Sequence, residues 1–103
     1  MDLNDYQRRA RETAIYPEQH RVVYPALGLA GETGETVERV KKWLRDGRLD
    51  REALRAEIGD VLWYVANLAA DLDLSLDEIA EGNLAKLRSR AERGVLSGSG
   101  DTR

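Results

Sequence analysis

The sequence predicts an all-α fold, in the form of a four-helix bundle-like protomer, from two observations. Four segments carry apolar residues at intervals of three and four, which is the spacing of one helix face and not the alternation of a strand. The strong helix formers Ala, Leu, Glu and Arg dominate these segments. With 103 residues, 42% of them hydrophobic, the chain suits one domain with a modest core. We expect that domain over residues 1–93, followed by a disordered Gly- and Ser-rich tail over residues 94–103.

The first helix is expected from Leu3 to Tyr16, because Pro17 ends the periodic pattern. Asn4 and Gln7 have the spacing of a capping box at its start. A loop or a single turn should follow, over residues 17–25.

The second helix should begin near Pro25, a good first-turn residue, and end about Arg45, before Asp46-Gly47. A third is expected over residues 50–71. The fourth should open at Ser75, which forms a capping box with Glu78, and continue to Arg93, before Gly94.

Composition limits the partners. The formal net charge of -3 offers no basic face for a nucleic acid polymer. No apolar run is long enough to span a membrane, and the N-terminus lacks the layout of a signal peptide, so we expect a cytoplasmic protein. Because the chain has no cysteine, a bound metal would need oxygen ligands or the one histidine, His20, which favours hard cations.

The third predicted helix is apolar on nearly all sides. One seam includes Leu54, Ile58 and Val65, the opposite side carries Trp63, and no charged residue occurs from Val61 to Ala70. Such a helix must be covered nearly all round, which short companion helices can scarcely do. We therefore expect a second copy to cover the Trp63 side, giving a dimer or a tetramer.

A polar line runs between these two apolar faces, in steps of 3, 4, 3 and 4. It consists of Glu57, Asp60, Tyr64, Asn67 and Asp71. Carboxylates in buried surroundings need a cation, strong donors or a proton. The alternative is a solvated stripe along a groove between subunits.

The second helix offers another acidic pair, Glu32 and Glu35, set among Gly28, Gly31 and Gly34. Alone, this pair would be a solvated face. However, each glycine costs a helix about 1 kcal/mol relative to alanine, and is more easily explained by a close neighbour or a ligand. The carboxylates are therefore expected to face a crowded site.

The two acidic pairs could meet, because a short connection favours antiparallel packing of the two helices. Carboxylates that converge in this way repel one another unless a divalent cation neutralises them. Mg²⁺ is the natural candidate, with Mn²⁺ as a possible substitute. Residues Glu32, Glu35, Glu57 and Asp60 are the expected ligands.

The fourth helix carries Asn83, Lys86, Arg90 and Arg93 beside its apolar seam. Cations in such positions can simply extend to solvent or stabilise the helix C-terminus. Alternatively, one or more of them hold phosphate oxygens beyond the metal.

Together these motifs resemble the MazG-like nucleoside triphosphate pyrophosphohydrolases of the all-α NTP pyrophosphatase superfamily. The resemblance rests on Glu32-x-x-Glu35, on "EIGDVLWYVANLA" with Glu57-x-x-Asp60, and on "NLAKLRSRAERG". It covers about Leu27 to Gly94, and two ordered acidic pairs on consecutive helices are far more specific than one.

The resemblance implies Mg²⁺-dependent hydrolysis of a nucleoside triphosphate to a monophosphate and pyrophosphate, in nucleotide-pool house-cleaning. It implies metal ligation by the four carboxylates, with Glu35 or Glu57 in catalysis and Glu35 favoured for orienting the attacking water. Asn83, Lys86 and Arg90 would bind the phosphates. Tyr64 and Asn67 are possible base contacts, as are Trp43 and the "HRVVY" loop.

Two other interpretations use the same residues differently. The chain could be a catalytically silent helical dimerisation module with a solvated acidic line. A ferritin-like di-iron bundle would need Glu-x-x-His pairs, and no predicted helix has one.

Overall fold

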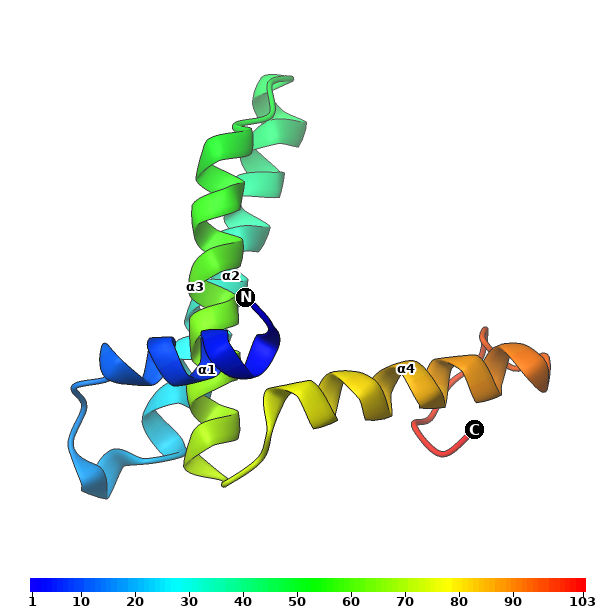
Figure 1. The fold of residues 1–103 in the computed structure, drawn as a ribbon. Coiled ribbons are helices and arrows are strands. Elements are labelled where there is room, and N and C mark those ends of the chain that lie inside the picture. Colours follow the sequence, from blue (N-terminus) through cyan, green and yellow to red (C-terminus); the bar gives the residue numbers. More distant parts are fainter.

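The computed structural model describes residues 1–103 and consists of helices joined by turns (Figure 1). The α-helices are α1 (Leu3–Glu12), α2 (Val23–Asp46), α3 (Arg51–Asp71) and α4 (Leu76–Glu92), with a 3-10 turn, η1, at Glu18–His20. There is no strand, so the all-α prediction is confirmed. No helix combines the length and the hydropathy that a membrane crossing requires.

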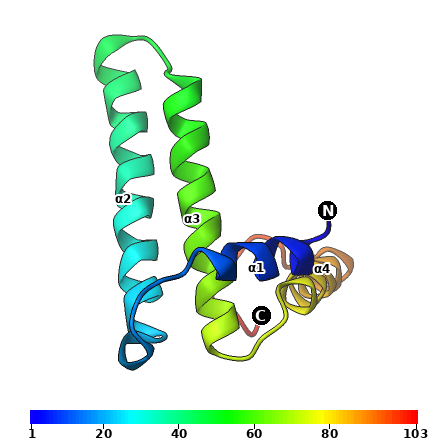
Figure 2. The ribbon, with the colours of Figure 1, turned by 60° about the vertical axis from the view of Figure 1, so that its left-hand side comes forward.

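The two longest helices, α2 and α3, form an antiparallel hairpin and lie side by side (Figure 2). Gly47 ends α2 in the left-handed conformation, with a φ of 75°, and its N–H donates to the carbonyl of Trp43 (2.8 Å). Asp50 then caps α3 by accepting a hydrogen bond from the N–H of Ala53 (3.0 Å). The stop predicted at Asp46-Gly47 is confirmed, and the short turn sends α3 back along α2.

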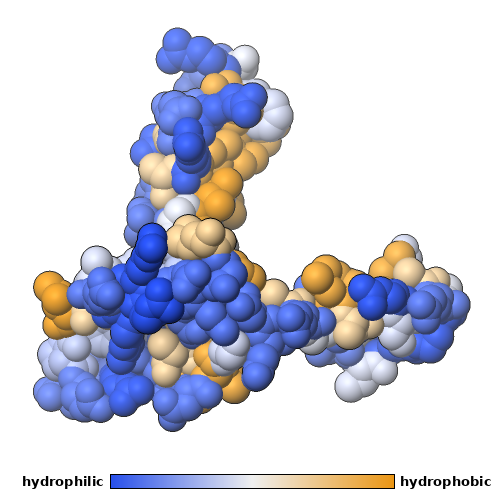
Figure 3. All heavy atoms as spheres, viewed as in Figure 1, coloured by the Kyte–Doolittle hydropathy of each residue, from blue (hydrophilic) through white to orange (hydrophobic).

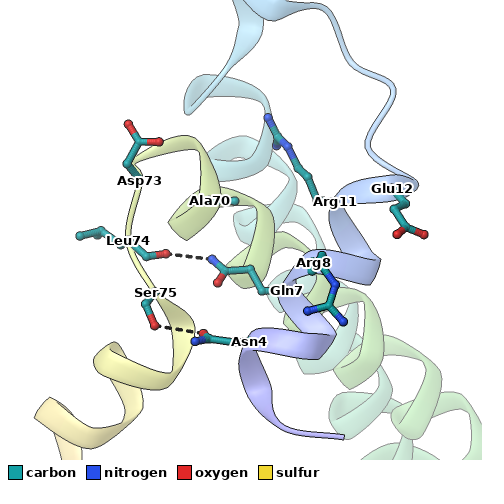
Figure 4. A pocket seen from close by; sticks show the side chains of 9 residues that line it. All are labelled: Asn4, Gln7, Arg8, Arg11, Glu12, Ala70, Asp73, Leu74 and Ser75. Atoms are coloured by element: carbon teal, nitrogen blue, oxygen red, sulfur yellow. Dashed lines mark hydrogen bonds between the residues drawn. The ribbon is translucent and has the colours of Figure 1, made fainter.

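The capping box predicted for α1 from Asn4 and Gln7 is wrong. Asp2 and Asp5 form the box instead, with the N–H of Asp5 donating to Asp2 Oδ1 (2.7 Å). The side chains of Asn4 and Gln7 turn towards α4. Asn4 Oδ1 accepts from the N–H of Asp77 (3.1 Å), and both residues line the groove drawn in Figure 4.

Helix α1 also ends earlier than expected, at Glu12 instead of Tyr16. The residues beyond it make tertiary hydrogen bonds that a further helical turn would not allow. Thr13 Oγ1 accepts from Trp63 Nε1 (2.7 Å), and the Tyr16 hydroxyl donates to Asp71 Oδ2 (2.7 Å). Contacts with α3 therefore override the local helical preference.

Helix α4 projects away from the α2–α3 hairpin (Figure 1) and contacts α1 and the end of α3. Ser75 caps it by accepting from the N–H of Glu78 (3.2 Å), which confirms the predicted N-cap, although this is one of the two hydrogen bonds of the predicted capping box. The packing is thus more open than that of a closed four-helix bundle, because the turn after α3 and the side chains of α1 direct α4 outwards.

Little of the chain is enclosed: eight of its 103 residues are buried. The apolar core consists of Ala10, Ala66, Ala69 and Leu76, where α1, α3 and α4 meet. Large apolar side chains remain exposed on α2, including Leu27 (69%), Val37 (61%) and Leu44 (80%). Others lie on α3 and α4, and Figure 3 shows apolar patches on the hairpin and on α4.

The Trp63 side of α3 is covered differently from the prediction. Trp63 packs against the core beneath α1 of the same chain and donates its indole hydrogen bond to Thr13. Trp63 itself is therefore partly covered by its own chain, and coverage of this side by a second copy stays a prediction. Apolar side chains such as Ile58 and Leu62 of α3 are also exposed.

Residues 94–103 form turns and bends that return to α4 (Figure 1). Asp101 accepts hydrogen bonds from Lys86 Nζ (2.7 Å) and Arg90 Nη2 (3.1 Å). The tail therefore has defined contacts in the structure, while its disorder in solution stays a prediction.

Candidate active site

Three carboxylates meet where α2 and α3 run side by side. Glu32 comes from α2, and Glu57 and Asp60 come from α3, each with a carboxylate oxygen within 4.8 Å of the others. Antiparallel pairing of the helices brings Glu32 opposite Glu57, and the three-residue step puts Asp60 on the same face as Glu57. Glu32 and Glu57, which lie 25 positions apart in the sequence, thus share one site.

The neighbouring carboxylates raise the affinity of Glu32 for a proton. The pKa of Glu32 is raised, first by a hydrogen bond with Glu57, then by desolvation and by the negative charges of Asp60, Glu57 and Glu35. Such a shift means that three ionised carboxylates are unfavourable together without a cation. An all-oxygen donor set of this kind suits a hard divalent ion, so these residues fit a metal centre.

Glu35 lies close to this group but is not one of the three. It is exposed on α2, one turn after Glu32, and contributes negative charge to the site. Its carboxylate is therefore placed differently from that of Glu32, although the helical spacing predicts that the two share a face.

A cation that sequence reasoning missed lies beside the carboxylates. Arg39 Nη2 is 3.6 Å from Glu57 Oε1, and the Glu57 side chain is only 13% exposed. Arg39 follows Glu35 by four residues, so helical spacing could have placed it on this face. The pairing with Glu57 itself depends on how α2 and α3 pack.

A cavity of about 380 Å³ opens directly next to the carboxylates. It is lined by the carboxylates Glu32 and Asp60 together with Thr13, Trp63 and Tyr64. The Tyr64 ring lies so close to Gly28 that a methyl group there would collide with it. Gly28 therefore makes room for an aromatic wall of the cavity, whereas Gly31 and Gly34 face open space.

The C-terminal half of the polar line on α3, Asn67 and Asp71, is a buried hydrogen-bond network. Asn67 is fully buried; its Oδ1 accepts from Arg11 Nη1 (3.4 Å), and its Nδ2 donates to the carbonyl of Trp63 (3.1 Å). It is enclosed by its own chain, so the expectation that Asn67 contacts a base is not supported. Tyr64 does line the cavity, which keeps it as a candidate.

Asp71 ends this line with a side chain that is 0% exposed. It pairs with Arg11 (2.6 Å) and accepts hydrogen bonds from the Tyr16 hydroxyl and from the N–H of Val22 (2.8 Å). Burial alone would raise the pKa of Asp71, but the hydrogen bonds from Val22, Tyr16 and Arg11 lower it overall. Asp71 thus ties the segment before α2 to the end of α3 and takes no part in the carboxylate site.

Val22 itself has a φ of 68°, which is rare for a β-branched residue. The N–H of Val23 donates to the carbonyl of Arg21 (2.7 Å), so Val22 sits at the centre of a tight γ-turn. The Asp71 carboxylate holds this turn and thereby sets where α2 begins.

The polar residues expected to bind phosphate lie on α4, outside the carboxylate site of the same chain (Figure 1). Lys86 and Arg90 are both held by Asp101 of the tail, and Arg90 is only 5% exposed. Asn83 is exposed on the projecting helix. One chain alone therefore does not bring these three residues to the carboxylates.

A larger cavity, about 550 Å³, lies between α1 and the turn that joins α3 to α4 (Figure 4). None of the three clustered carboxylates lines it. Gln7 crosses this groove to reach the carbonyl of Leu74 (2.9 Å), and Ser75 donates to Asn4 (3.0 Å). Its polar groups mainly serve the junction of the helices.

Comparison with known proteins gives two matches. The sequence pattern of the MazG nucleotide pyrophosphohydrolase domain matches residues 25–95, which include the three carboxylates. The "Gene 37 protein" of Mycobacterium phage L5 is 46% identical over 114 residues, with all of both chains covered. No solved structure matches the chain significantly.

Proposed function

The chain belongs to the MazG nucleotide pyrophosphohydrolase domain family, and from this premise we propose that it hydrolyses nucleoside triphosphates between the α and β phosphates. The products would be a nucleoside monophosphate and pyrophosphate. The observation that carries the proposal is the meeting of Glu32, Glu57 and Asp60 from two helices. A role in house-cleaning of the cytoplasmic nucleotide pool is the corresponding biological expectation.

Mg²⁺ is the proposed cofactor, with Mn²⁺ as a substitute. Glu32, Glu57 and Asp60 would hold it, since their oxygens already lie within 4.8 Å of one another. When bound, such an ion polarises phosphoryl oxygens, activates water and offsets charge on the leaving pyrophosphate. The raised pKa of Glu32 supports the assignment, because it reflects an excess of negative charge at the site.

Glu35 is proposed to orient the attacking water. Its carboxylate is near enough to influence Glu32 but lies outside the close group of three, which leaves it free to accept a hydrogen bond from water. Glu57 is proposed to contribute to catalysis by binding the metal ion. No covalent nucleophile is needed for this reaction.

The cavity beside the carboxylates is the proposed place for the nucleoside. Tyr64 and Trp63 supply aromatic surface, and Thr13 lines the same cavity, although its hydroxyl already accepts from Trp63. A volume of about 380 Å³ is within the usual range for a small-molecule site.

Asn83, Lys86 and Arg90 stay proposed phosphate-binding residues, supplied to the site by a second copy of the chain. Two observations support a homo-oligomer, dimer or tetramer. Few residues are buried within one chain, and apolar side chains on α2, α3 and α4 are exposed. Because α4 projects, its cations are free to reach a neighbouring protomer once Asp101 releases them.

The decisive experiment incubates purified protein with a panel of canonical and modified nucleoside triphosphates and Mg²⁺, and separates the products by chromatography. Monophosphate with pyrophosphate is expected. Diphosphate with orthophosphate would reject the proposal.

The alternative function, a catalytically silent dimerisation module, draws on the exposed apolar surface. Thermal melting of chelator-treated protein distinguishes the two. A metal centre predicts a midpoint that rises with MgCl₂ by mass action, whereas a silent module predicts the same response to MgCl₂ as to NaCl of equal ionic strength.

A further inference from the structure

A row of aromatic side chains runs beside the carboxylate site: Tyr16, Tyr24, Tyr64 and Trp63. Tyr16 stacks on Tyr24, with ring centroids 4.9 Å apart and an interplanar angle of 24°. Tyr24 meets Tyr64 at 6.4 Å, and Tyr64 meets Trp63 at 5.0 Å in a T-shaped arrangement. Aromatic pairs attract one another at such separations. The aromatic row therefore joins the segment before α2, the first turn of α2 and the middle of α3 in one packed unit.

Hydrogen bonds fix both ends of the aromatic row. At one end, the Tyr16 hydroxyl accepts from Arg11 Nη1 (2.8 Å) and donates to Asp71 Oδ2 (2.7 Å). At the other end, Trp63 Nε1 donates to Thr13 Oγ1 (2.7 Å). Arg11 lies in the last turn of α1, and Thr13 is the C-cap of the same helix. Both ends thus rest on one short stretch of chain, and the rings between them are held in place.

Tyr64 links the aromatic row to the cavity beside the carboxylates, which it lines together with Glu32 and Asp60. The Tyr64 ring packs directly against Gly28, where a methyl group would collide with it. Tyr24 precedes Gly28 by four residues on α2, so both lie on the same face of that helix, one turn apart. The Tyr24 ring and the bare backbone at Gly28 together form a seat for the Tyr64 ring.

Tyr24 itself is not among the residues that line the cavity, and it is 45% exposed. Its effect on a molecule in the cavity therefore passes through Tyr64. A side chain that is fixed before binding does not have to be ordered when the ligand arrives, and this preorganisation favours affinity.

We propose that Tyr24 is a positioning residue for the nucleoside: its ring, stacked on Tyr16, holds the Tyr64 ring in place as a wall of the cavity. The inference rests on the proposed function and deepens it, because it assigns a role in substrate binding to a residue outside the cavity. It also separates the two parts of the substrate. Nucleoside binding depends on Tyr24, whereas binding of the phosphates does not.

The test measures binding by isothermal titration calorimetry with Mg²⁺ present. The ligands are the common deoxynucleoside monophosphates (dAMP, dCMP, dGMP and dTMP) and inorganic pyrophosphate. Tyr24→Ala should weaken binding of the monophosphate that the wild type prefers by about three- to tenfold, because a mobile Tyr64 side chain must then be ordered on binding. Pyrophosphate affinity should stay within about twofold, since Tyr24 acts on the wall of the nucleoside cavity alone.

Steady-state kinetics with a triphosphate provide a second readout. In Tyr24→Ala the KM should rise while kcat stays within about twofold, as expected when an interaction equal in ground and transition states is lost. General damage to the fold would instead lower kcat and weaken the binding of both ligands. A loss of that unselective kind would overturn the positioning role.

Two further variants distinguish the ring from its bulk. Tyr24→Phe keeps the ring and should bind the monophosphate within about twofold of the wild type. Tyr24→Leu keeps apolar bulk without a flat ring, so it should fold and yet resemble Tyr24→Ala in nucleotide binding. Wild-type affinity in Tyr24→Leu, or a loss in Tyr24→Phe equal to that in Tyr24→Ala, would overturn the inference.

The matched control is Ile15→Ala. Ile15 is a large apolar residue next to Tyr16 in the chain, but it is 94% exposed and takes no part in the aromatic row. Its truncation should change monophosphate affinity by less than about twofold. Equal losses in Ile15→Ala and Tyr24→Ala would reduce the effect to the loss of apolar surface and overturn the inference.

The two readouts separate this inference from the proposed function. Turnover with unchanged KM and unchanged monophosphate affinity in Tyr24→Ala overturns the positioning role and leaves the hydrolase. A selective loss of monophosphate binding in a protein without turnover supports the positioning role and rejects the hydrolase. A wild type that binds no monophosphate and turns over no triphosphate overturns both.

Discussion

Gln7 of α1 holds the first turn of α4: its Oε1 accepts a hydrogen bond from the N–H of Leu76 (3.1 Å). Its amide nitrogen donates in turn to the carbonyl of Leu74 (2.9 Å), so one side chain fixes both the turn and the helix start (Figure 4). The direction in which α4 projects therefore depends on a residue that lies 69 positions earlier in the chain.

Gln7→Ala should destabilise the protein by about 1–2 kcal/mol, because it leaves the N–H of Leu76 and the carbonyl of Leu74 without their partner. Chemical denaturation measures the loss, and hydrogen exchange should show the first turn of α4 less protected. Gln19→Ala, at an exposed position of the 3-10 turn, is the control and should change stability by less than about 0.5 kcal/mol. Equal stability of the two variants would contradict the assigned role.

Gly28 and Gly31 predict opposite effects of the same substitution. Gly28→Ala drives a methyl group into the Tyr64 ring and should cost about 1–3 kcal/mol. Gly31→Ala meets nothing within 4 Å and should stabilise α2 by up to about 1 kcal/mol. Thermal melting of the two variants compares them directly, and a Gly28→Ala protein as stable as Gly31→Ala would refute the close packing of Tyr64.

Glu57→Gln should abolish pyrophosphate release while leaving the metal-free protein as stable as the wild type, or slightly more so. The reason is that the substitution removes a metal ligand and also one of three mutually repelling carboxylates. Product analysis and melting in the presence of a chelator provide the two measurements. Glu52→Gln, in the first turn of α3 and exposed, should retain activity. Full activity of the folded Glu57→Gln protein would exclude Glu57 as a ligand.

Asp71 should make stability depend on pH in the acidic range. Its pKa in the folded protein is lowered from the ordinary value of 3.8. Asp71 therefore contributes fully to the free energy of unfolding above about pH 4, and this contribution is lost as the pH falls through the folded pKa. Asp71→Asn should cost about 3 kcal/mol at pH 7 and flatten the fall in stability between pH 4 and pH 2. Denaturant melts across this range test the expectation.

The control for that series is Asp73→Asn. Asp73 is exposed with a φ of 57°, a conformation that asparagine also tolerates. Its variant should keep the wild-type dependence on pH. An unchanged slope in Asp71→Asn would mean that the buried pairs do not perturb Asp71 in solution.

Lys86 and Asp101 should have opposite effects on substrate binding. Lys86→Ala is expected to raise the KM with little change in metal affinity, because Lys86 is a proposed phosphate ligand. Asp101→Asn should lower the KM, since the tail carboxylate then no longer competes for Lys86 and Arg90. Steady-state kinetics with a triphosphate measure both. Unchanged kinetics in both variants would exclude Lys86 as a phosphate ligand.

Much of the carboxylate site follows from local pattern. Glu57 and Asp60 share a face because helical spacing requires it, and Glu32 meets them because the Asp46-Gly47 turn makes the helices antiparallel. The pairing of Arg39 with Glu57 could not be predicted in the same way, because it depends on the rotation of α2 against α3. The same holds for Thr13, which reaches the cavity only after α1 ends early.

The sequence by itself determined four helices, the turn between α2 and α3 and the acidic residues that these two helices carry, since helix periodicity and turn residues act over a few neighbouring positions. Only the tertiary structure decided where α1 stops, which way α4 points and what encloses Asn67 and Asp71. These features depend on hydrogen bonds between residues 49 to 73 positions apart. Such bonds form only when a particular donor atom and acceptor atom come within about 3 Å, and no local pattern specifies that approach.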